Sequence, residues 1–115
     1  MNKLKYKFGE IYLTKFHPEM GSEMGKYRPA VVINVIVNKI DEKLVMICPI
    51  TSTTRKNNNK YELLLKKDEH LDKNSYMLLW YLRVIDVNRL EYKIGSVPKD
   101  IALKAKVLLK ELFSA

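Results

Sequence analysis

Two apolar, β-branched runs separated by a short polar segment constrain the fold of this chain more than any other feature. Residues 29–37 read PAVVINVIV, and residues 43–50 read KLVMICPI. Runs of this length that are rich in Val and Ile are typical of buried β-strands, and they are too short and too branched for helices. We therefore predict two buried strands joined by a polar turn at residues 38–42, with Pro49 near the end of the second strand or at a sheet edge.

The remaining segments predict further strands and one closing helix. Strand-forming residues occupy 8–15, 60–65 and 74–86, the last as one long bent strand or two short ones. From Pro98 onward the apolar residues recur at helical spacing, and Ser96 could cap this helix. The apolar stripe consists of Ile101, Ala105, Leu108, Leu109 and Leu112. The pattern predicts a mainly β (α+β) fold, in which a small, strongly bent sheet or barrel carries a C-terminal α-helix.

Length, charge and cysteine content restrict the class of protein. A chain of 115 residues can bury a core without disulfides or metals, so we expect residues 1–115 to form a single domain. The net charge of +8 favours a polyanionic partner such as RNA or DNA without specifying one. The single cysteine, Cys48, lies in an apolar run, which predicts a buried, inert thiol and fits a reducing cytoplasm. No signal peptide or membrane-spanning run is visible, so we expect a cytoplasmic protein with no membrane partner.

Several kinds of chemistry lack their sequence signatures. There is no glycine-rich phosphate loop, no dinucleotide fingerprint and no CxxC pair, and His17 and His70 have no nearby companion ligands. The acidic pairs at residues 41–42 and 68–69 lie in polar turns, where solvated side chains are the ordinary case. We therefore expect neither a metal nor any other cofactor.

Residues 21–33, GSEMGKYRPAVVI, carry the most functional information. Two glycines allow a mobile loop, and Pro29 biases Arg28 toward an extended backbone where this loop enters the strand. A guanidinium there can hold a phosphate with two N–H donors and stabilise added negative charge, although a surface arginine before a strand is the ordinary alternative. A second loop at residues 49–55 offers four hydroxyls and Arg55, which could bind phosphate oxygens or simply form a turn.

Three motifs, in order along the chain, resemble those of the MazF/PemK family of bacterial toxins. They comprise Gly9-Glu10-Ile11-Tyr12 with Pro18, Gly21-Ser22-Glu23 and Arg28-Pro29; then the Ile-Thr-Ser turn that contains Thr51 and Ser52; and then LRVID at residues 82–86. The resemblance covers nearly the whole chain and implies an SH3-like β-barrel with added helices, in a homodimer. It also implies a sequence-selective endoribonuclease toxin that a cognate antitoxin protein neutralises.

The same resemblance implies that Arg28 and Thr51 are the catalytic pair. With the 2′-hydroxyl of the substrate as nucleophile, single-stranded RNA such as mRNA would be cut without a metal, whereas DNA would stay intact. Arg28 would stabilise the phosphorane, and Thr51 would hydrogen-bond the scissile phosphate or the 2′-hydroxyl. The predicted RNA-binding residues are Ser52, Glu23, Lys26, Tyr27, Arg55 and Lys56.

Trp80-Tyr81 is a departure from the family pattern that matters, because relatives often carry an acidic residue or glutamine there. These aromatics could stack on unpaired bases, but packing in the barrel or at a dimer interface is the more common use of an apolar stretch such as MLLWYL. Two alternatives to an endoribonuclease stay open. One is a toxin of the same fold that binds a protein such as gyrase without catalysis, and the other is an RNA-binding module that does not cleave.

Overall fold

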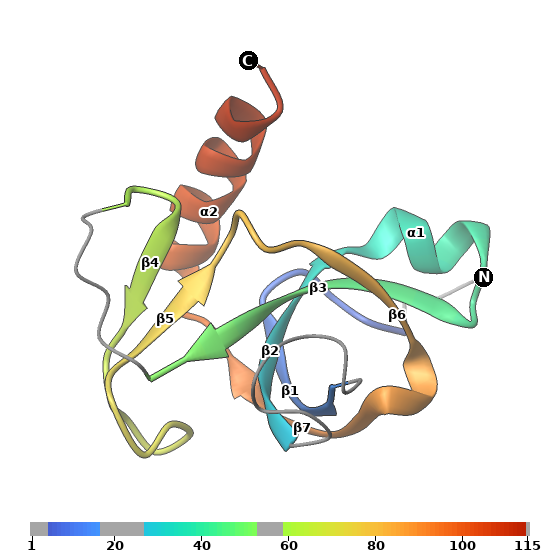
Figure 1. Cartoon of the computed structure of the whole chain (residues 1–115), viewed down its shortest axis with the longest axis horizontal. Coiled ribbons are helices and arrows are strands. Elements are labelled where there is room, and N and C mark those ends of the chain that lie inside the picture. Colours follow the sequence, from blue (N-terminus) through green and yellow to red (C-terminus); the bar gives the residue numbers. More distant parts are fainter. Residues whose placement is uncertain (1–4, 17–26, 53–58, 115) are drawn as a thin grey trace.

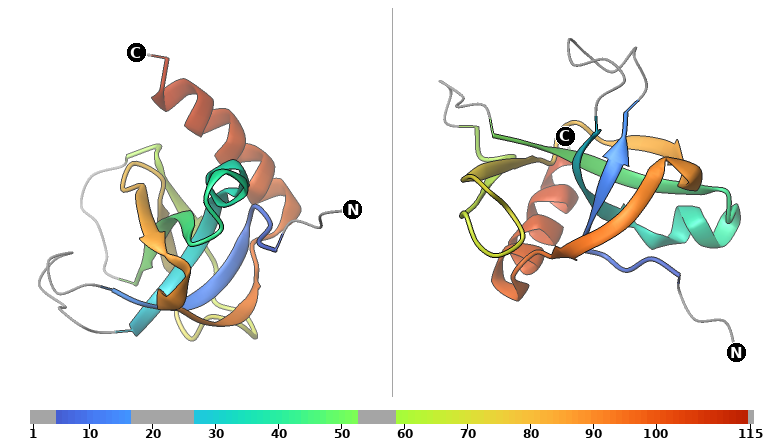
Figure 2. Two further views of the ribbon diagram at one scale, coloured as in Figure 1. Left: turned by 90° about the vertical axis from the view of Figure 1, so that its right-hand side faces the viewer. Right: turned by 90° about the horizontal axis from the view of Figure 1, so that it is seen from below.

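A strongly bent antiparallel sheet forms the centre of the molecule, and the C-terminal helix packs against one of its faces (Figures 1 and 2). The computed structural model describes residues 5–16, 27–52 and 59–114. The strands are β1 (Glu10–Lys15), β2 (Tyr27–Asn34), β3 (Leu44–Thr51), β4 (Glu62–Leu65), β5 (Ser75–Leu78), β6 (Arg83–Asp86) and β7 (Leu90–Ser96). The helices are α1 (Val35–Ile40), the 3₁₀ turn η2 (Val87–Arg89) and α2 (Lys99–Leu112).

The sheet branches at β3. Its strand order is β4-β5-β3-β2-β1-β7, with β6 paired to residues 44–47 of β3 and β5 paired to the last two residues of the same strand. Pro49 falls between these two pairings, so its missing N–H interrupts neither of them. This position agrees with its expected place near the end of the strand. Residues 74–86 form two short strands, β5 and β6, as one of the predicted arrangements required.

Side chains alternate between the two faces of the sheet, and each face has its own apolar core. On the helix face, Val31 and Cys48 of the sheet pack together with Ala105 and Leu108 of α2. Cys48 is fully buried, as predicted, and burial raises the pKa of its thiol. The opposite face, which we call the inner face, curls around a second core made of Tyr6, Phe16, Ala30, Val32, Val45, Ile47 and Ile85.

This curled sheet is an open structure and only loosely a barrel. β6, η2 and β7 follow one another and carry the chain around the inner core, helped by a 2.9 Å hydrogen bond from the Val87 N–H to the Lys43 carbonyl. In the described part of the chain β6 and β7 do not pair, so the sheet does not close on itself. The predicted mainly β fold with a C-terminal helix is confirmed, and the open sheet supports the predicted barrel only loosely.

The segment after β2 differs from its prediction. Residues 35–37 leave the sheet, and residues 35–40 form α1 where the end of a strand and a polar turn were expected. The register of β2 against β3 is already shifted between Val32 and Asn34. The Asp41 N–H then donates to the Val37 carbonyl at 3.0 Å, and the Asn38 amide donates to the Leu44 carbonyl at 2.8 Å. These hydrogen bonds stabilise a helical turn although its residues are β-branched, because tertiary contacts override a weak intrinsic preference for strand.

α2 follows the predicted apolar stripe, but it begins differently. Ser96 is the last residue of β7 and does not cap the helix, because Pro98 occupies the N-cap position and makes no side-chain cap bond. Ala105 and Leu108 are buried, and the other members of the stripe are half-buried. In the part of the chain that the structure describes, no helix is long and apolar enough to cross a bilayer.

Gly9 joins the N-terminal segment to the sheet with a backbone that other residues rarely adopt. Its φ is 91°, its N–H donates to the Val32 carbonyl, and its carbonyl accepts from the Val97 N–H, each at 2.9 Å. A Cβ at this position would lie 3.2 Å from Val97 Cγ2. We therefore expect Gly9→Ala to lower the free energy of unfolding by about 1–2 kcal/mol. Urea denaturation measures this difference, and an unchanged or higher midpoint would contradict the expectation.

Candidate active site

The positions of Arg28 and Thr51 follow from the register of β2 against β3. These strands pair antiparallel, and the pairing starts with Ala30 opposite Pro49 and continues with Val31 opposite Cys48. Arg28 lies two residues before Ala30 on β2, and Thr51 lies two residues after Pro49 on β3, so both residues lie at the same end of these neighbouring strands. Both residues are half-buried. The fold therefore brings together the two side chains that the sequence proposes as a pair.

Arg28 and Thr51 lie at the mouth of the inner core. Side chains two residues apart in a strand share a face, so Arg28 lies on the side of Ala30 and Val32, and Thr51 lies on the side of Ile47. Those three apolar residues are fully buried. The guanidinium and the hydroxyl thus stand on strands that a rigid core fixes in place, as a preorganised site requires.

Two side chains at the end of β1 flank Arg28. Thr14 pairs with Arg28 across the β1–β2 ladder, and its fully buried hydroxyl donates to the Tyr12 carbonyl at 3.0 Å. The buried ring of Phe16 lies with its centroid 5.8 Å from Arg28 Cζ, within the range of a cation–π interaction. Phe16 therefore supports the guanidinium, whereas the Thr14 hydroxyl is used by the backbone.

A cluster of aromatic and charged side chains lies further along the sheet. The rings of Trp80 and Tyr81 stack, with centroids 5.2 Å apart and planes 16° apart, and Trp80 Nε1 donates to Glu62 Oε2 at 2.7 Å. Arg83 Cζ lies 5.6 Å from the Tyr81 ring centroid, and Arg83 Nη1 donates to the Tyr81 hydroxyl at 3.5 Å. We call Glu62, Trp80, Tyr81 and Arg83 the aromatic platform. Trp80 is 41% exposed, so packing inside the barrel, one of its three expected uses, does not apply to it.

Only two of the other predicted site residues, Ser52 and Tyr27, lie in the described part of the chain. Ser52 is exposed and directly follows β3 beside Thr51. Tyr27 is 50% exposed, but as the strand neighbour of Arg28 it lies on the opposite face of the sheet. Glu23, Lys26, Arg55 and Lys56 lie outside the described residues.

Sequence reasoning missed Arg83 and Glu62 as members of this surface. Arg83 was visible as the arginine of the third motif, LRVID, and its alternation with the buried Ile85 would have placed it on the inner face. Glu62 had no comparable signal, because its bond to Trp80 joins positions that are 18 residues apart in the chain.

Glu10 and Tyr12 of the first motif stabilise the fold. Glu10 is buried, accepts a 2.7 Å hydrogen bond from the Lys7 N–H and forms a 2.9 Å ion pair with Lys93 of β7. The Tyr12 ring packs edge-on against Tyr6 with centroids 5.5 Å apart. Burial, together with the nearby charge of Glu10, raises the pKa of the Tyr12 hydroxyl. These residues hold β1 to its neighbours and so fix the strand that flanks Arg28.

Metal-ligating side chains do not cluster in the described residues. Across residues 5–16, 27–52 and 59–114, no three His, Cys, Asp or Glu side chains converge as metal ligands would. His70 packs on Gly95 of β7 so closely that a Cβ on that glycine would approach the His70 Cγ to 2.8 Å. His17 lies outside the described residues.

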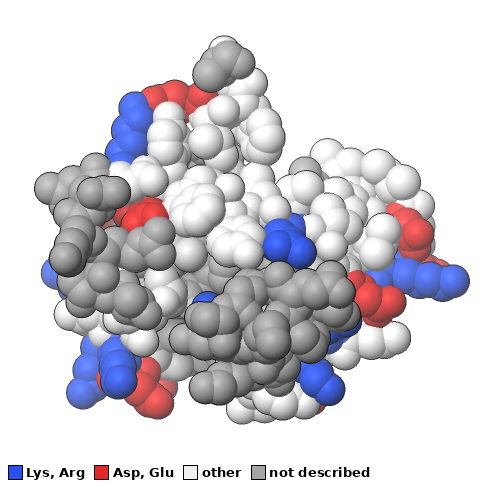
Figure 3. Space-filling view, in the orientation of Figure 1, with Lys and Arg blue, Asp and Glu red and all other residues white. Residues whose placement is uncertain are grey.

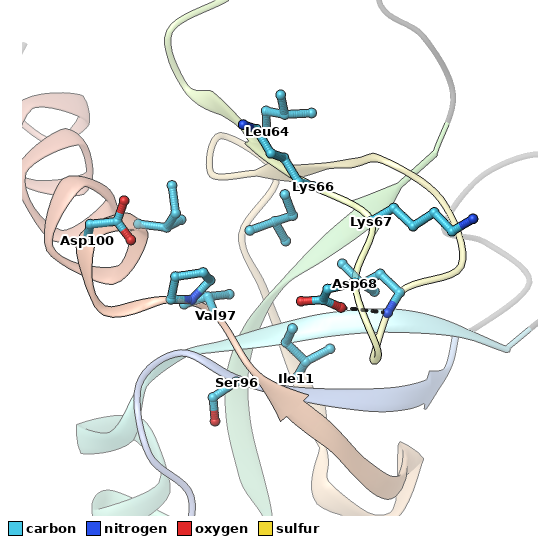
Figure 4. Close-up of a pocket in the computed structure, with 12 residues that line it drawn as sticks. Ile11, Leu64, Lys66, Lys67, Asp68, Ser96, Val97 and Asp100 are labelled. Atoms are coloured by element: carbon cyan, nitrogen blue, oxygen red, sulfur yellow. Dashed lines mark hydrogen bonds between the residues drawn. The ribbon is translucent and has the colours of Figure 1, made fainter.

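A cavity of about 290 Å³ lies between the start of α2 and the segment that follows β4 (Figure 4). Its lining includes Ile11, Leu65 and Val97 of the helix-face core, together with Asp68. The Asp68 carboxylate accepts backbone N–H bonds from the two residues at positions 70 and 71, and the bond from His70 holds its pKa below the usual value. Of the predicted site residues that the structure describes, none lines this cavity.

Basic side chains are dispersed over the surface that Figure 3 shows, among neutral and acidic ones, and they form no continuous patch there among the described residues. Among the described residues of this face, the positions of single cations therefore matter more for binding a phosphate than a uniformly positive field does.

A guanidinium and a hydroxyl on neighbouring strands, with the exposed Trp80 ring on the same sheet, are groups that can bind the phosphates and bases of a nucleic acid. The sequence model of the PemK-like, MazF-like toxins of type II toxin–antitoxin systems matches residues 7–113. The chain belongs to this family, as its three motifs predicted.

Individual relatives agree with this assignment. The chain is 33% identical over 87 residues to the Endoribonuclease MazF of Staphylococcus saprophyticus, a match that covers 75% of this chain and 72% of that protein. MazF from Deinococcus radiodurans shares its fold with a TM-score of 0.70 at 25% identity, covering 99% of this chain and 100% of that one. MazF in a MazE-MazF structure from the same organism gives 0.69 at 25% identity, covering 96% and 97%. The predicted class, an endoribonuclease toxin family, is confirmed.

Proposed function

We propose that this protein, as a single domain over residues 1–115, is a sequence-selective endoribonuclease toxin that cleaves single-stranded RNA, mRNA included, without a metal ion. The observation that carries the proposal is that Arg28 of β2 and Thr51 of β3 lie at the same end of two paired strands, each two residues beyond the Ala30–Pro49 pair. Membership of the toxin family and the likeness to an endoribonuclease support the activity.

The reaction uses a nucleophile that RNA itself supplies. The 2′-oxygen forms a bond to the adjacent phosphorus while the bond from phosphorus to the 5′-oxygen breaks. The 2′-hydroxyl loses its proton and the leaving 5′-oxygen gains one, which gives a 2′,3′-cyclic phosphate and a 5′-hydroxyl. Because no water has to be activated, the chemistry needs no metal-bound hydroxide, and DNA resists it for lack of a 2′-hydroxyl.

Arg28 and Thr51 have complementary tasks in this reaction. The Arg28 guanidinium donates two parallel N–H bonds to the non-bridging oxygens and stabilises the charge that accumulates in the phosphorane. Its very high pKa in the free side chain makes it a poor general base. The Thr51 hydroxyl donates to the phosphate or accepts from the 2′-hydroxyl, and Ser52 offers a second hydroxyl next to it. The roles of Glu23, Lys26, Tyr27, Arg55 and Lys56 in binding RNA stay predictions.

We further propose a homodimer in the cytoplasm whose activity a cognate antitoxin protein suppresses. The family to which the chain belongs consists of toxins from toxin–antitoxin systems, and a relative from Deinococcus radiodurans has been solved as MazE-MazF.

Cleavage of a mixed RNA by the purified protein in excess EDTA tests the proposed activity. We expect cuts at a restricted set of sequences, and none in DNA of the same sequences. No cleavage at micromolar protein would contradict the proposal. RNA binding without cutting would indicate a binding module, and stalled gyrase–DNA complexes would indicate the gyrase-binding alternative.

Phe16 offers a test of how Arg28 is held. Stepwise fluorination of the Phe16 ring preserves its shape but removes the negative potential of its face, which a cation–π contact requires. We expect kcat for RNA cleavage to fall progressively, by about 2- to 30-fold for the fully fluorinated ring, with KM little changed. Urea denaturation serves as the control for folding. Equal kcat values across the series would show that the ring acts by packing alone.

A further inference from the structure

We propose that the aromatic platform stacks against an unpaired base of the RNA, so that Trp80 and Tyr81 contribute to the choice of cleavage site in place of an amide or a carboxylate. This inference rests on the proposed function and concerns a part of the surface separate from Arg28 and Thr51. Its occupant is a nucleobase next to the phosphate that those two residues hold.

The platform lies on the same face of the sheet as the catalytic pair. Thr51 of β3 pairs with Tyr76 of β5, and the β4–β5 register places Glu62 on the same side as Tyr76. At the other end of the platform, Arg83 of β6 pairs with Ile47, so it lies on the same face as this member of the inner core. Both ends of the platform are therefore anchored on the inner face.

The platform is also close to Thr51 along the strand. Residues 79–82 connect β5, which pairs with residues 50–51 of β3, to β6, which pairs with residues 44–47 of the same strand. This connection therefore runs beside Pro49, about 7 Å along β3 from Thr51. The Trp80 indole itself is bonded to Glu62 of β4, which lies two strand spacings, about 10 Å, from β3. A nucleotide that adjoins the bound phosphate, with its base extended, spans a distance of this order.

Several interactions fix the rings in place. The Trp80 N–H is bonded to Glu62 at 2.7 Å, the Tyr81 ring lies against the indole, and Arg83 lies over Tyr81. The indole is nevertheless 41% exposed. A rigid, partly exposed aromatic surface loses little conformational entropy when a base stacks on it. Because a purine covers more of an indole than a pyrimidine does, we expect a purine preference at this position.

Trp80 is the only tryptophan of the chain, so intrinsic fluorescence reports on the platform directly. The probe is a deoxyadenosine oligonucleotide, which lacks the 2′-hydroxyl and stays intact, labelled with a dye at one end. An abasic oligonucleotide of equal length provides the same phosphates without bases. We expect the first to quench Trp80 on binding and the second to leave it unchanged. If dye anisotropy showed that the deoxyadenosine oligonucleotide binds while Trp80 fluorescence stayed unchanged, the proposal would be overturned.

Substitutions of Trp80 provide a second test of base stacking. We expect Trp80→Leu to weaken binding of the deoxyadenosine oligonucleotide by about 5- to 100-fold and to raise KM for RNA, with kcat little changed, while Trp80→Phe keeps most of the affinity. Phe113→Leu is the matched control, because Phe113 is an exposed aromatic at the end of α2. Unchanged affinity in Trp80→Leu would overturn the proposal.

The outcomes separate this inference from the proposed function. Normal RNA cleavage together with an unchanged platform signal rejects base stacking and leaves the endoribonuclease intact. Quenching in a protein that cleaves no RNA rejects the proposed reaction and leaves a base-binding surface. A Trp80 signal that depends on protein concentration but not on the oligonucleotide assigns the platform to a dimer interface and overturns the inference.

Discussion

Arg28→Ala is expected to lower kcat for RNA cleavage by about 10³-fold or more, which is the scale seen when a preorganised donor to a transition-state oxyanion or phosphoryl group is removed. In the proposed mechanism the side chain stabilises charge that develops only as the 2′-oxygen attacks, so we expect kcat to fall more than KM rises. The contact with the Phe16 ring and the place of Arg28 at the same strand end as Thr51 support this proposal. Single-turnover cleavage of a short RNA measures the loss.

Two further variants sharpen the result. Arg28→Lys keeps the charge but loses the two-pronged donor, so we expect an intermediate rate. Lys104→Ala removes a cation from an exposed position on α2 and is expected to cleave at close to the wild-type rate. Near-normal cleavage by Arg28→Ala, or an equal loss in Lys104→Ala, would show that general charge matters and that Arg28 has no special role.

Thr51→Val is expected to lower kcat by about 10- to 100-fold, because the variant keeps the shape of the side chain and loses one hydrogen bond to a charged group. Thr51→Ser restores the hydroxyl and should recover most of the activity. The comparison of these two variants separates the hydroxyl from the packing of the side chain.

Thr14→Val is the matched control for Thr51→Val. Thr14 lies on the other side of Arg28, but its hydroxyl is bonded to the Tyr12 carbonyl. We therefore expect this variant to lower the free energy of unfolding by about 1 kcal/mol and to leave kcat nearly unchanged. If Thr14→Val lost as much activity as Thr51→Val, the assignment of Thr51 to the reaction would be wrong.

The strands and the helix that bury apolar side chains could be predicted from the sequence, whereas β7 and α1 could not. The β-branched runs that became β2 and β3 and the stripe of α2 carry strong patterns. β7 was missed because it is mostly exposed and contains Glu91 and Lys93, and its pairing with β1 is interrupted by register irregularities. α1 was missed because long-range hydrogen bonds, and not propensity, select it.

The candidate site was predictable as residue types but not as geometry. The loop-to-strand junction suggested Arg28, and the resemblance to the toxin family pointed to Thr51. Their proximity depends on the register of β2 against β3. Because α1 lies between the two strands in the chain, this register cannot be predicted from the local sequence. The platform depends on contacts such as that between Glu62 and Trp80, which only the folded chain creates.

The ends of the RNA fragments test the central claim most directly. A short RNA that the protein cuts once is incubated with it in excess EDTA, beside the same RNA with a single 2′-deoxy nucleotide on the 5′ side of the cut. The account predicts a 2′,3′-cyclic phosphate and a 5′-hydroxyl from the first RNA and no cleavage of the second. Fragments with a 3′-hydroxyl and a 5′-phosphate, or normal cleavage of the 2′-deoxy RNA, would contradict it.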